Sequence, residues 1–375
     1  MHFDPSRRHF GCLAGAAALT PWLAACGGSS DQEAREEEYV KAVESMFRDY
    51  HPPGILAGVH LAGEEPWMAA FGLADVDAGT PLALNSSFPI RSITKSFTVT
   101  LLLRLVQSGQ LALDHKIGRY FSGVPNGDLI NLGDLAGNQS GLADYSVQPG
   151  FGQALLENTL RVWTPQELLA FSFAVEPAFL PGAQYQYSNT NTVLLGLLIE
   201  QVTGQSLPEV LAAQIFRPLG LRGTIYPFSA VLPAPTPTSY SVNVLTGDVD
   251  DQPLISPTSL AGSGAMASTL ADLLIWGEAL GEGLLLNSST QALRKSMSRD
   301  VTNGPEYDRY GLGIGQIGNW WGHTGTGVGF QVATMNHATR RATISVMLNS
   351  TPDPDSARQH FNMAQELFER LAAVV

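Results

Sequence analysis

The chain has 375 residues, of which 44% are hydrophobic and only 15% are charged, and its formal net charge is −13 at pH 7. This composition predicts a globular protein with a sizeable core, and it excludes a disordered chain or a coiled coil. The negative charge argues against nucleic acid as a partner, because binding phosphates requires a basic surface.

Residues 1–25 have the features of a bacterial export signal. Arg7 and Arg8 precede a weakly apolar run rich in alanine and glycine, and this run is shorter than the roughly 20 residues that a membrane-spanning helix needs. It ends at Cys26 and resembles a lipoprotein signal of the twin-arginine type, in which this cysteine carries the lipid. We therefore expect an exported protein on the periplasmic side, anchored to the cell membrane or outer membrane only by lipid on Cys26. A secretory signal with a chance cysteine is the alternative.

The only two cysteines, Cys12 and Cys26, both lie in this N-terminal part. The body of the chain therefore has no internal disulfide, thiolate metal site or cysteine nucleophile. HExxH and CxxC patterns are absent, and the eight histidines are scattered. We accordingly expect no metal and no cofactor.

Beyond a short tether at 26–32, the pattern of elements differs between the chain ends and the middle. Apolar residues at helical spacing predict amphipathic helices at 33–49 and near the C-terminus. Strand-like runs occur early and late in the chain. They lie at 55–60, 67–71, 330–335 and 343–348.

The middle of the chain, 98–260, predicts mostly helices and loops. One helix is opened by the capping box of Thr164 and Glu167, and 231–258 predicts a long surface excursion. The fold class is therefore α/β in the α+β sense. An antiparallel sheet forms from both chain ends, 33–97 and 261–375, flanked by helices, and 98–260 is an inserted, mostly helical domain.

Ser92 and Lys95 form a Ser-x-x-Lys pattern at the start of an apolar run. On a helix, residues three apart project from the same face, so the hydroxyl and the amine lie close together. Serine is a poor nucleophile at neutral pH, and a desolvated lysine can act as its base. Taken alone, the pattern is equally consistent with a solvated lysine beside a capping serine.

Tyr187 and Asn189 form a second motif, Tyr-Ser-Asn, ahead of a predicted helix. A phenol near a lysine ammonium has a lowered pKa and can relay a proton. The Asn189 amide can hold a substrate carbonyl or orient the lysine. A buried tyrosine with an ordinary hydrogen bond is the simpler alternative for this motif alone.

His323, Thr324, Gly325 and Thr326 form a third motif before a strand-like run. A glycine-rich strand edge allows a substrate backbone to lie close to it and to accept from its N–H groups. A plain turn between strands is the alternative.

The three motifs together, in this order, resemble those of the serine β-lactamase and D-Ala-D-Ala carboxypeptidase superfamily. The variants are similar to those of the branch that holds class C β-lactamases, penicillin-binding-protein-like carboxypeptidases and related esterases. Further segments look like landmarks of this superfamily in the same order, so the resemblance covers most of residues 40–375. These segments are 109–114, 138–142, 217–221 and 261–264.

This resemblance implies roles for the motif residues. Ser92 attacks an acyl carbonyl, and Lys95 and Tyr187 shuttle its proton to the leaving group and then activate water. Asn189 positions the substrate, and residues 323–326 bind it. The backbone N–H groups of Ser92 and Thr326 form the oxyanion hole. Whether Lys95 or Tyr187 is the general base stays open.

The implied function is a serine hydrolase that acts through an acyl-enzyme on an amide, ester or lactam carbonyl, like a D-Ala-D-Ala carboxypeptidase or an esterase. Its expected partner is a small-molecule or peptidoglycan-like substrate, and we expect a monomer. Many β-lactamases have lysine where this chain has His323, and a histidine is only partly charged near pH 7. We therefore expect esters to be cleaved and nitrocefin poorly. The alternative is a non-hydrolytic acyl-ligand or cell-wall binding protein of the same fold.

The segment before Ser140 also departs from the superfamily pattern. It reads Ala136-Gly137-Asn138-Gln139, a stretch in which relatives often carry a histidine and a threonine. What this segment does for the substrate stays open at this point.

Overall fold

The computed structural model describes residues 30–302, 307–357 and 361–375. The predicted signal, with Cys12 and Cys26, lies outside the described residues. The first helix, α1 (Ser30–Tyr50), begins earlier than the predicted residue 33, so the end of the predicted tether is helical. Within the described ranges, no helix is long and apolar enough to cross a membrane.

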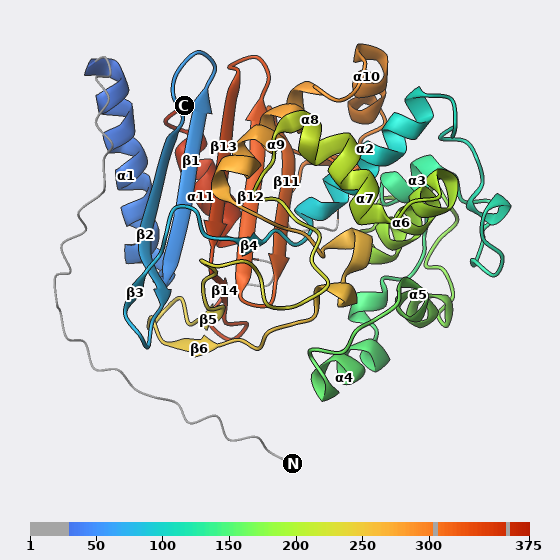
Figure 1. The fold of residues 1–375 in the computed structure, drawn as a ribbon, viewed down its shortest axis with the longest axis horizontal. Helices are drawn as coiled ribbons and strands as arrows, with labels where there is room; N and C mark the ends of the chain where they lie inside the picture. Colours follow the sequence, from blue (N-terminus) through green and yellow to red (C-terminus); the bar gives the residue numbers. More distant parts are fainter. Residues whose placement is uncertain (1–29, 303–306, 358–360) are drawn as a thin grey trace.

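The centre of the fold is a nine-stranded sheet with the order β3-β2-β1-β13-β12-β11-β10-β9-β8 (Figure 1). All its neighbouring strands run antiparallel. The early strands join the late ones where β1 pairs with β13, with Val59 opposite Ile344. The strands are β1 (Gly54–Leu61), β2 (Trp67–Asp75), β3 (Thr80–Pro81), β8 (Arg299–Asp300), β9 (Arg309–Tyr310), β10 (Gly315–Ile317), β11 (Trp320–Gly327), β12 (Phe330–His337) and β13 (Ala342–Leu348).

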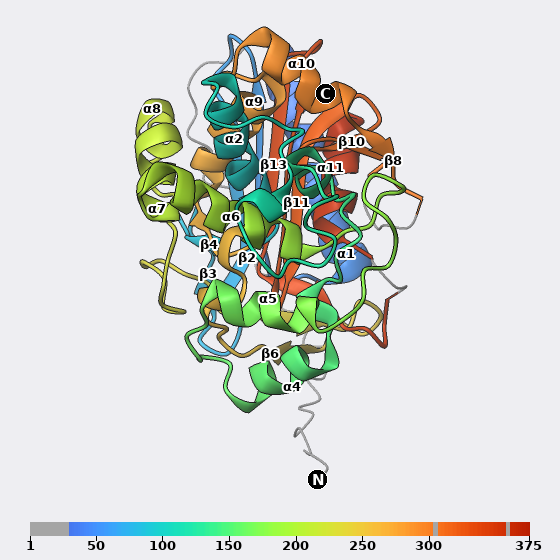
Figure 2. The same ribbon diagram turned by 90° about the vertical axis from the view of Figure 1, so that its right-hand side faces the viewer.

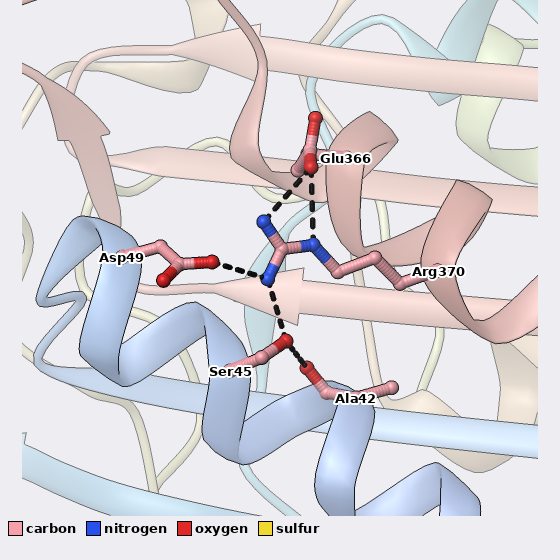
Figure 3. Close-up of polar contacts among 5 residues, drawn as sticks. All are labelled: Ala42, Ser45, Asp49, Glu366 and Arg370. Carbon is pink, nitrogen blue, oxygen red and sulfur yellow. Dashed lines mark hydrogen bonds and ion pairs between the residues drawn. The ribbon is translucent and has the colours of Figure 1, made fainter.

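One face of the sheet is covered by α1 and by the C-terminal helix α11 (Met363–Ala372). Their apolar sides form a core with the strands, in which the rings of Trp320 and Phe368 lie 5.4 Å apart. Arg370 joins the two helices at the rim (Figure 3). Its guanidinium lies 2.7 Å from the Asp49 carboxylate on α1 and 2.9 Å from Glu366 on its own helix.

The opposite face packs against α9 (Leu270–Glu282) and the helices of the middle of the chain. Gly277 lies so close to β12 and β13 that an added Cβ would collide with Thr334 and Thr343. The buried helix α2 (Ile93–Gln107) docks on α9 by stacking Phe97 on Trp276, with ring centroids 3.7 Å apart.

The remaining helices lie mainly beyond α2, on the right of the sheet in Figure 1 and in front in Figure 2. They are α3 (Leu132–Ala136), α4 (Pro149–Glu157), α5 (Pro165–Phe173), α6 (Asn189–Thr203), α7 (Leu207–Leu211), α8 (Arg217–Leu219) and α10 (Ser288–Ser296). A π-helical turn lies at Ala212–Phe216, and 3-10 turns lie at Ile117–Arg119, Tyr145–Val147, Pro257–Ser259 and Ala261–Ser263. The capping box that opens α5 is present, since Thr164 and Glu167 bond each other's backbone.

Two small sheets lie outside the central one. β4 (Phe88–Pro89) pairs with β7 (Ala267–Ser268). β14 (Ser350–Pro352), β5 (Tyr240–Val242) and β6 (Val249–Asp251) form the other. The predicted surface excursion at 231–258 is thus tied back to the body through β5 and β6.

The predicted fold class is confirmed: an antiparallel sheet built from both chain ends is flanked by helices, and mostly helical segments are inserted between. The boundary expected at residues 97 and 98 falls inside α2. Both parts therefore share this helix, and the division into domains stays a prediction.

Candidate active site

Ser92 and Lys95 lie at the start of α2, as the sequence predicts. Ser92 is the N-cap residue of the helix, and the Lys95 ammonium lies 3.1 Å from Ser92 Oγ. Lys95 is fully buried, because α2 is apolar nearly all round and packs into the core on every side. The lysine is therefore held in a desolvated environment beside the hydroxyl.

The Lys95 ammonium has two further acceptors. It donates to Asn189 Oδ1 over 2.6 Å and to the carbonyl of Ser263 over 2.8 Å. An ammonium has three N–H donors, and Ser92, Asn189 and Ser263 supply an acceptor for each of them. The sequence singled out the first two acceptors but not the Ser263 carbonyl.

Tyr187 completes the group around the hydroxyl. Its Oη lies 2.6 Å from Ser92 Oγ, and the Lys95 ammonium lies 4.8 Å from the centre of its ring. The side chain is partly exposed, yet the protein packed around it raises the pKa of Tyr187 well above its usual value, against the lowering effect of the hydrogen bond to Ser92. The expectation that the neighbouring lysine lowers this pKa is therefore wrong, because desolvation of the phenolate outweighs it.

Asn138 explains the departure noted before Ser140. It is buried and adopts a positive φ of 54°, and its Oδ1 accepts hydrogen bonds from the Ser188 N–H and from Asn191 Nδ2. Its carbonyl also accepts from the Gln186 N–H. Asn138 therefore holds the backbone on both sides of Tyr187, at Gln186 and at Ser188.

Asp144 belongs to the site, and the sequence motifs did not identify it. Asn189 Nδ2 donates to the two oxygens of Asp144 at 3.0 and 3.3 Å and to Ser146 Oγ at 2.9 Å. Since Asn189 Oδ1 accepts from Lys95, its amide joins the carboxylate to the ammonium. The carboxylate also caps the turn at Tyr145–Val147, which fixes its direction.

His323 lies on β11 and is only 1% exposed. Its Nδ1 lies 2.6 Å from the Thr324 carbonyl, which can only accept, so Nδ1 carries the proton. Nε2 then accepts from the Tyr310 hydroxyl over 2.9 Å. Burial is the main cause that lowers the pKa of His323 to about 3.

The expectation that His323 is partly charged near neutral pH is therefore wrong. The ring is neutral, and both nitrogens have partners in the protein. Whether His323 contributes to substrate binding stays a prediction.

Thr324, Gly325 and Thr326 continue β11. The Tyr307 hydroxyl bonds both the Thr324 backbone N–H and its Oγ1, which holds this end of the strand. Gly325 passes so close to Ile90 and Arg91 that an added Cβ would collide with the Ile90 carbonyl. Glycine thus lets β11 approach the residues just before Ser92. Thr326 lies at the exposed end of the strand, where its Oγ1 accepts a hydrogen bond from Asn362 Nδ2.

The structure therefore brings Ser92, Lys95, Tyr187 and Asn189 into one hydrogen-bonded group. It brings Gly325 of the third motif against Ile90 and Arg91, directly before Ser92, and the assignment of 323–326 to substrate binding stays a prediction. The sequence motifs did not identify Tyr307, Tyr310, Asp144 or the Ser263 carbonyl. No cluster of His, Cys, Asp or Glu side chains suited to a metal ion occurs in the part of the chain that the structure describes.

Comparisons with known proteins agree with this geometry. A D-aminopeptidase from Brucella anthropi is 30% identical over 235 residues, which is 62% of this chain and 44% of that protein. This chain therefore spans less than half of the relative's length in the match.

Two solved structures cover nearly the whole chain. D-amino acid amidase from Ochrobactrum anthropi SV3, solved with L-phenylalanine amide, has a TM-score of 0.80 and 25% identity, and the match covers 92% of this chain and 98% of that one. A D-stereospecific amidohydrolase from Streptomyces sp. has a TM-score of 0.75 and 30% identity, over 89% and 97% of the two chains.

The Beta-lactamase family profile matches residues 33–368. This match confirms the predicted superfamily. With the fold and the serine-lysine-tyrosine group in agreement, the chain belongs to the Beta-lactamase family.

Proposed function

We propose that this protein is a serine hydrolase that opens the amide bond of a small amino-acid amide or short peptide through an acyl-enzyme on Ser92. The observation that carries the proposal is the placement of Ser92 Oγ between Tyr187 Oη, at 2.6 Å, and Lys95 Nζ, at 3.1 Å. A nucleophile within hydrogen-bond reach of two proton-transfer groups is the arrangement that acyl transfer requires.

The first step forms a bond between Ser92 Oγ and the carbonyl carbon while the hydroxyl proton leaves toward the lysine-tyrosine pair. The raised pKa of Tyr187 keeps its phenol protonated at neutral pH. This favours Lys95, reacting as the neutral amine that its burial stabilises, as the proton acceptor, and Tyr187 as the relay that hands a proton to the departing nitrogen. In deacylation, the oxygen of a water molecule bonds to the acyl carbon while the pair takes a proton from it. The bond between Ser92 Oγ and the acyl carbon then breaks, and the pair returns a proton to Ser92 Oγ.

The carbonyl oxygen becomes negatively charged in this step and needs donors. We assign them to the backbone N–H groups of Ser92, at the start of α2, and Thr326, at the end of β11. The close passage of Gly325 beside Ile90 supports this pairing. One such donor is worth about 3 to 4 kcal/mol in the transition state.

An amide or ester substrate fits this site better than a β-lactam. A neutral, buried His323 offers no positive charge to the carboxylate that β-lactams carry. The similarity to a D-aminopeptidase, a D-amino acid amidase and a D-stereospecific amidohydrolase supports an amide of a D-amino acid as the first choice. Esters and D-Ala-D-Ala peptides come next.

Steady-state hydrolysis of four substrates tests this ranking: D-phenylalanine amide with its L-enantiomer as the matched control, a p-nitrophenyl ester, a D-Ala-D-Ala peptide and nitrocefin. We expect a higher kcat/KM for the D-amide than for the L-amide, and slow nitrocefin turnover. Nitrocefin cleaved faster than the amides and esters would reverse the assignment. If no substrate is cleaved, the non-hydrolytic binding protein becomes the better description.

We also propose export and lipid attachment at Cys26, which rest on the sequence of residues 1–26 alone, and a monomeric state. Membrane fractionation of cells expressing the whole chain tests the attachment, with Cys26→Ser as the variant. The variant should move to the soluble periplasmic fraction. Equal amounts of both forms in the membrane fraction would contradict the lipid anchor. The mass of the released protein, measured by sedimentation, tests the monomeric state.

A further inference from the structure

Arg91 directly precedes the nucleophile and is the starting point of the inference. It adopts a positive φ of 49°, and the residue is 8% exposed. The side chain runs past Gly325 and Gly327 and ends with Nη2 donating to the Val328 carbonyl over 2.8 Å. The guanidinium also lies 5.6 Å from the centre of the Phe330 ring.

The buried guanidinium is poorly satisfied. Among the residues that the structure describes, no carboxylate pairs with Arg91, and Nη2 is the one guanidinium nitrogen with a hydrogen-bond acceptor. Nε is enclosed and has no partner. Burial lowers the pKa of Arg91 to about 10, so the group is still a cation at neutral pH. A buried charge without a counter-ion is costly.

Arg294 provides the contrast, because it is also buried without a carboxylate partner. Its Nε donates to the Leu312 carbonyl, and Nη2 donates to the Ser96 carbonyl and to Thr100 Oγ1. Arg294 is thus held by three acceptors inside the core, as expected for a structural arginine. Arg91 has one acceptor and borders a cavity.

The cavity beside Arg91 has a volume of about 40 Å³. Its walls are mostly apolar, with Phe330, Met266 and Leu254 among them, and it reaches solvent where Leu254 is 53% exposed. One water needs roughly 10 to 15 Å³, so the space suits a group of about three heavy atoms, such as a carboxylate. Gly264 also lines the cavity, one residue after the Ser263 carbonyl that holds Lys95.

We propose that the cavity lined by Arg91 and Phe330 is a binding site for a small carboxylate group. The carboxylate supplies the counter-charge that the guanidinium lacks, and its hydrogen bonds are of the strong, charge-assisted kind. The group belongs either to the acid side chain of the substrate, a reading that rests on the proposed hydrolase function, or to a free short-chain acid. Both sources present the same chemistry to Arg91.

Binding is tested first without turnover, on the Ser92→Ala protein. Its thermal unfolding is measured in acetate and in acetamide, with sodium chloride holding the ionic strength constant. Because a ligand of the folded state raises Tm, acetate should raise it over acetamide. Adding Arg91→Met should abolish the difference, and Arg91→Lys should keep part of it. Equal Tm values in acetate, acetamide and chloride would overturn the proposal, even where Arg91→Met does not fold.

Turnover then distinguishes the two sources. The wild-type protein is compared on p-nitrophenyl hydrogen glutarate and on its neutral methyl ester. If the substrate supplies the carboxylate, kcat/KM should favour the acid by roughly 10- to 100-fold, the range for a hydrogen bond to a charged group, and Arg91→Met should lose the preference. If a free acid binds, the two esters react alike and acetate, but not acetamide, changes their rate.

These experiments distinguish a failure of the carboxylate site from a failure of the hydrolase assignment. A protein that binds acetate but cleaves no amide or ester retains the carboxylate site and loses the hydrolase assignment. A protein that cleaves the neutral ester, with no preference for the acid and no response to acetate, keeps the hydrolase assignment and refutes the carboxylate site. Arg91 would then only hold the β11–β12 turn through Val328.

Discussion

The burial of His323 predicts a specific dependence of stability on pH. Its pKa lies near 3 in the folded protein, against a usual value of 6.5. Between these values the unfolded chain binds a proton that the folded protein does not, so the free energy of unfolding falls as the pH drops. From pH 8 to pH 4 the loss from this one residue is roughly 3 kcal/mol, and it approaches roughly 5 kcal/mol below pH 3.

Urea unfolding at pH 8, 6.5, 5 and 4 measures this effect when the wild type is compared with His323→Gln, whose amide does not titrate. The variant should be less stable than the wild type at pH 8, because the Tyr310 hydroxyl loses the His323 Nε2 to which it donates. The difference between their free energies of unfolding should narrow by roughly 3 kcal/mol at pH 4. The exposed His51 serves as the control through His51→Asn, which tolerates the positive φ of 54° there. Parallel pH curves for wild type and His323→Gln would refute the neutral, buried state of this ring.

Three further substitutions test other parts of the structure. Asp144→Asn removes the charge that orients Asn189. With the loss of one charged hydrogen bond, kcat on the best amide should fall roughly tenfold while Tm stays unchanged. An unchanged kcat would show that Asp144 does not belong to the site. Gly277→Ala should lower the free energy of unfolding by about 1 to 3 kcal/mol, because the added methyl group overpacks against Thr334. Gly152→Ala is the control, since Gly152 has open space around it. Equal Tm values for the two variants would contradict the close packing of α9. Arg370→Met should cost about 1 kcal/mol by releasing α1 from α11. Lys41→Met, at an exposed position on α1, is the control and should leave urea unfolding unchanged; equal effects of the two substitutions would contradict the role of Arg370.

Local features of the sequence predicted much of the fold and the centre of the site. The three-residue spacing of Ser92 and Lys95 on a helix fixes their proximity without any tertiary information. The Thr164 capping box and the strand-like runs are similarly local, and they gave α5 and the strands β1, β2, β12 and β13. The order of the three motifs along the chain indicated the superfamily.

The remaining features depend on contacts between distant segments. Asp144 reaches the site through Asn189, and Tyr310 through His323, and no local pattern marks either residue. The protonation states of Tyr187 and His323 depend on how deeply the folded chain buries them. Both were misjudged because charge and residue type can be read from a sequence, whereas desolvation cannot.

The central claim is that Ser92 is the residue that becomes acylated, with Lys95 and Tyr187 handling its proton. Intact-mass measurement after exposure to a fluorophosphonate tests it most directly. We expect one adduct on the wild-type protein, mapped to the peptide that contains Ser92, none on Ser92→Ala, and slowed labelling of Tyr187→Phe. A wild-type protein that stays unlabelled, or a Ser92→Ala protein that is labelled to the same extent, would contradict the account.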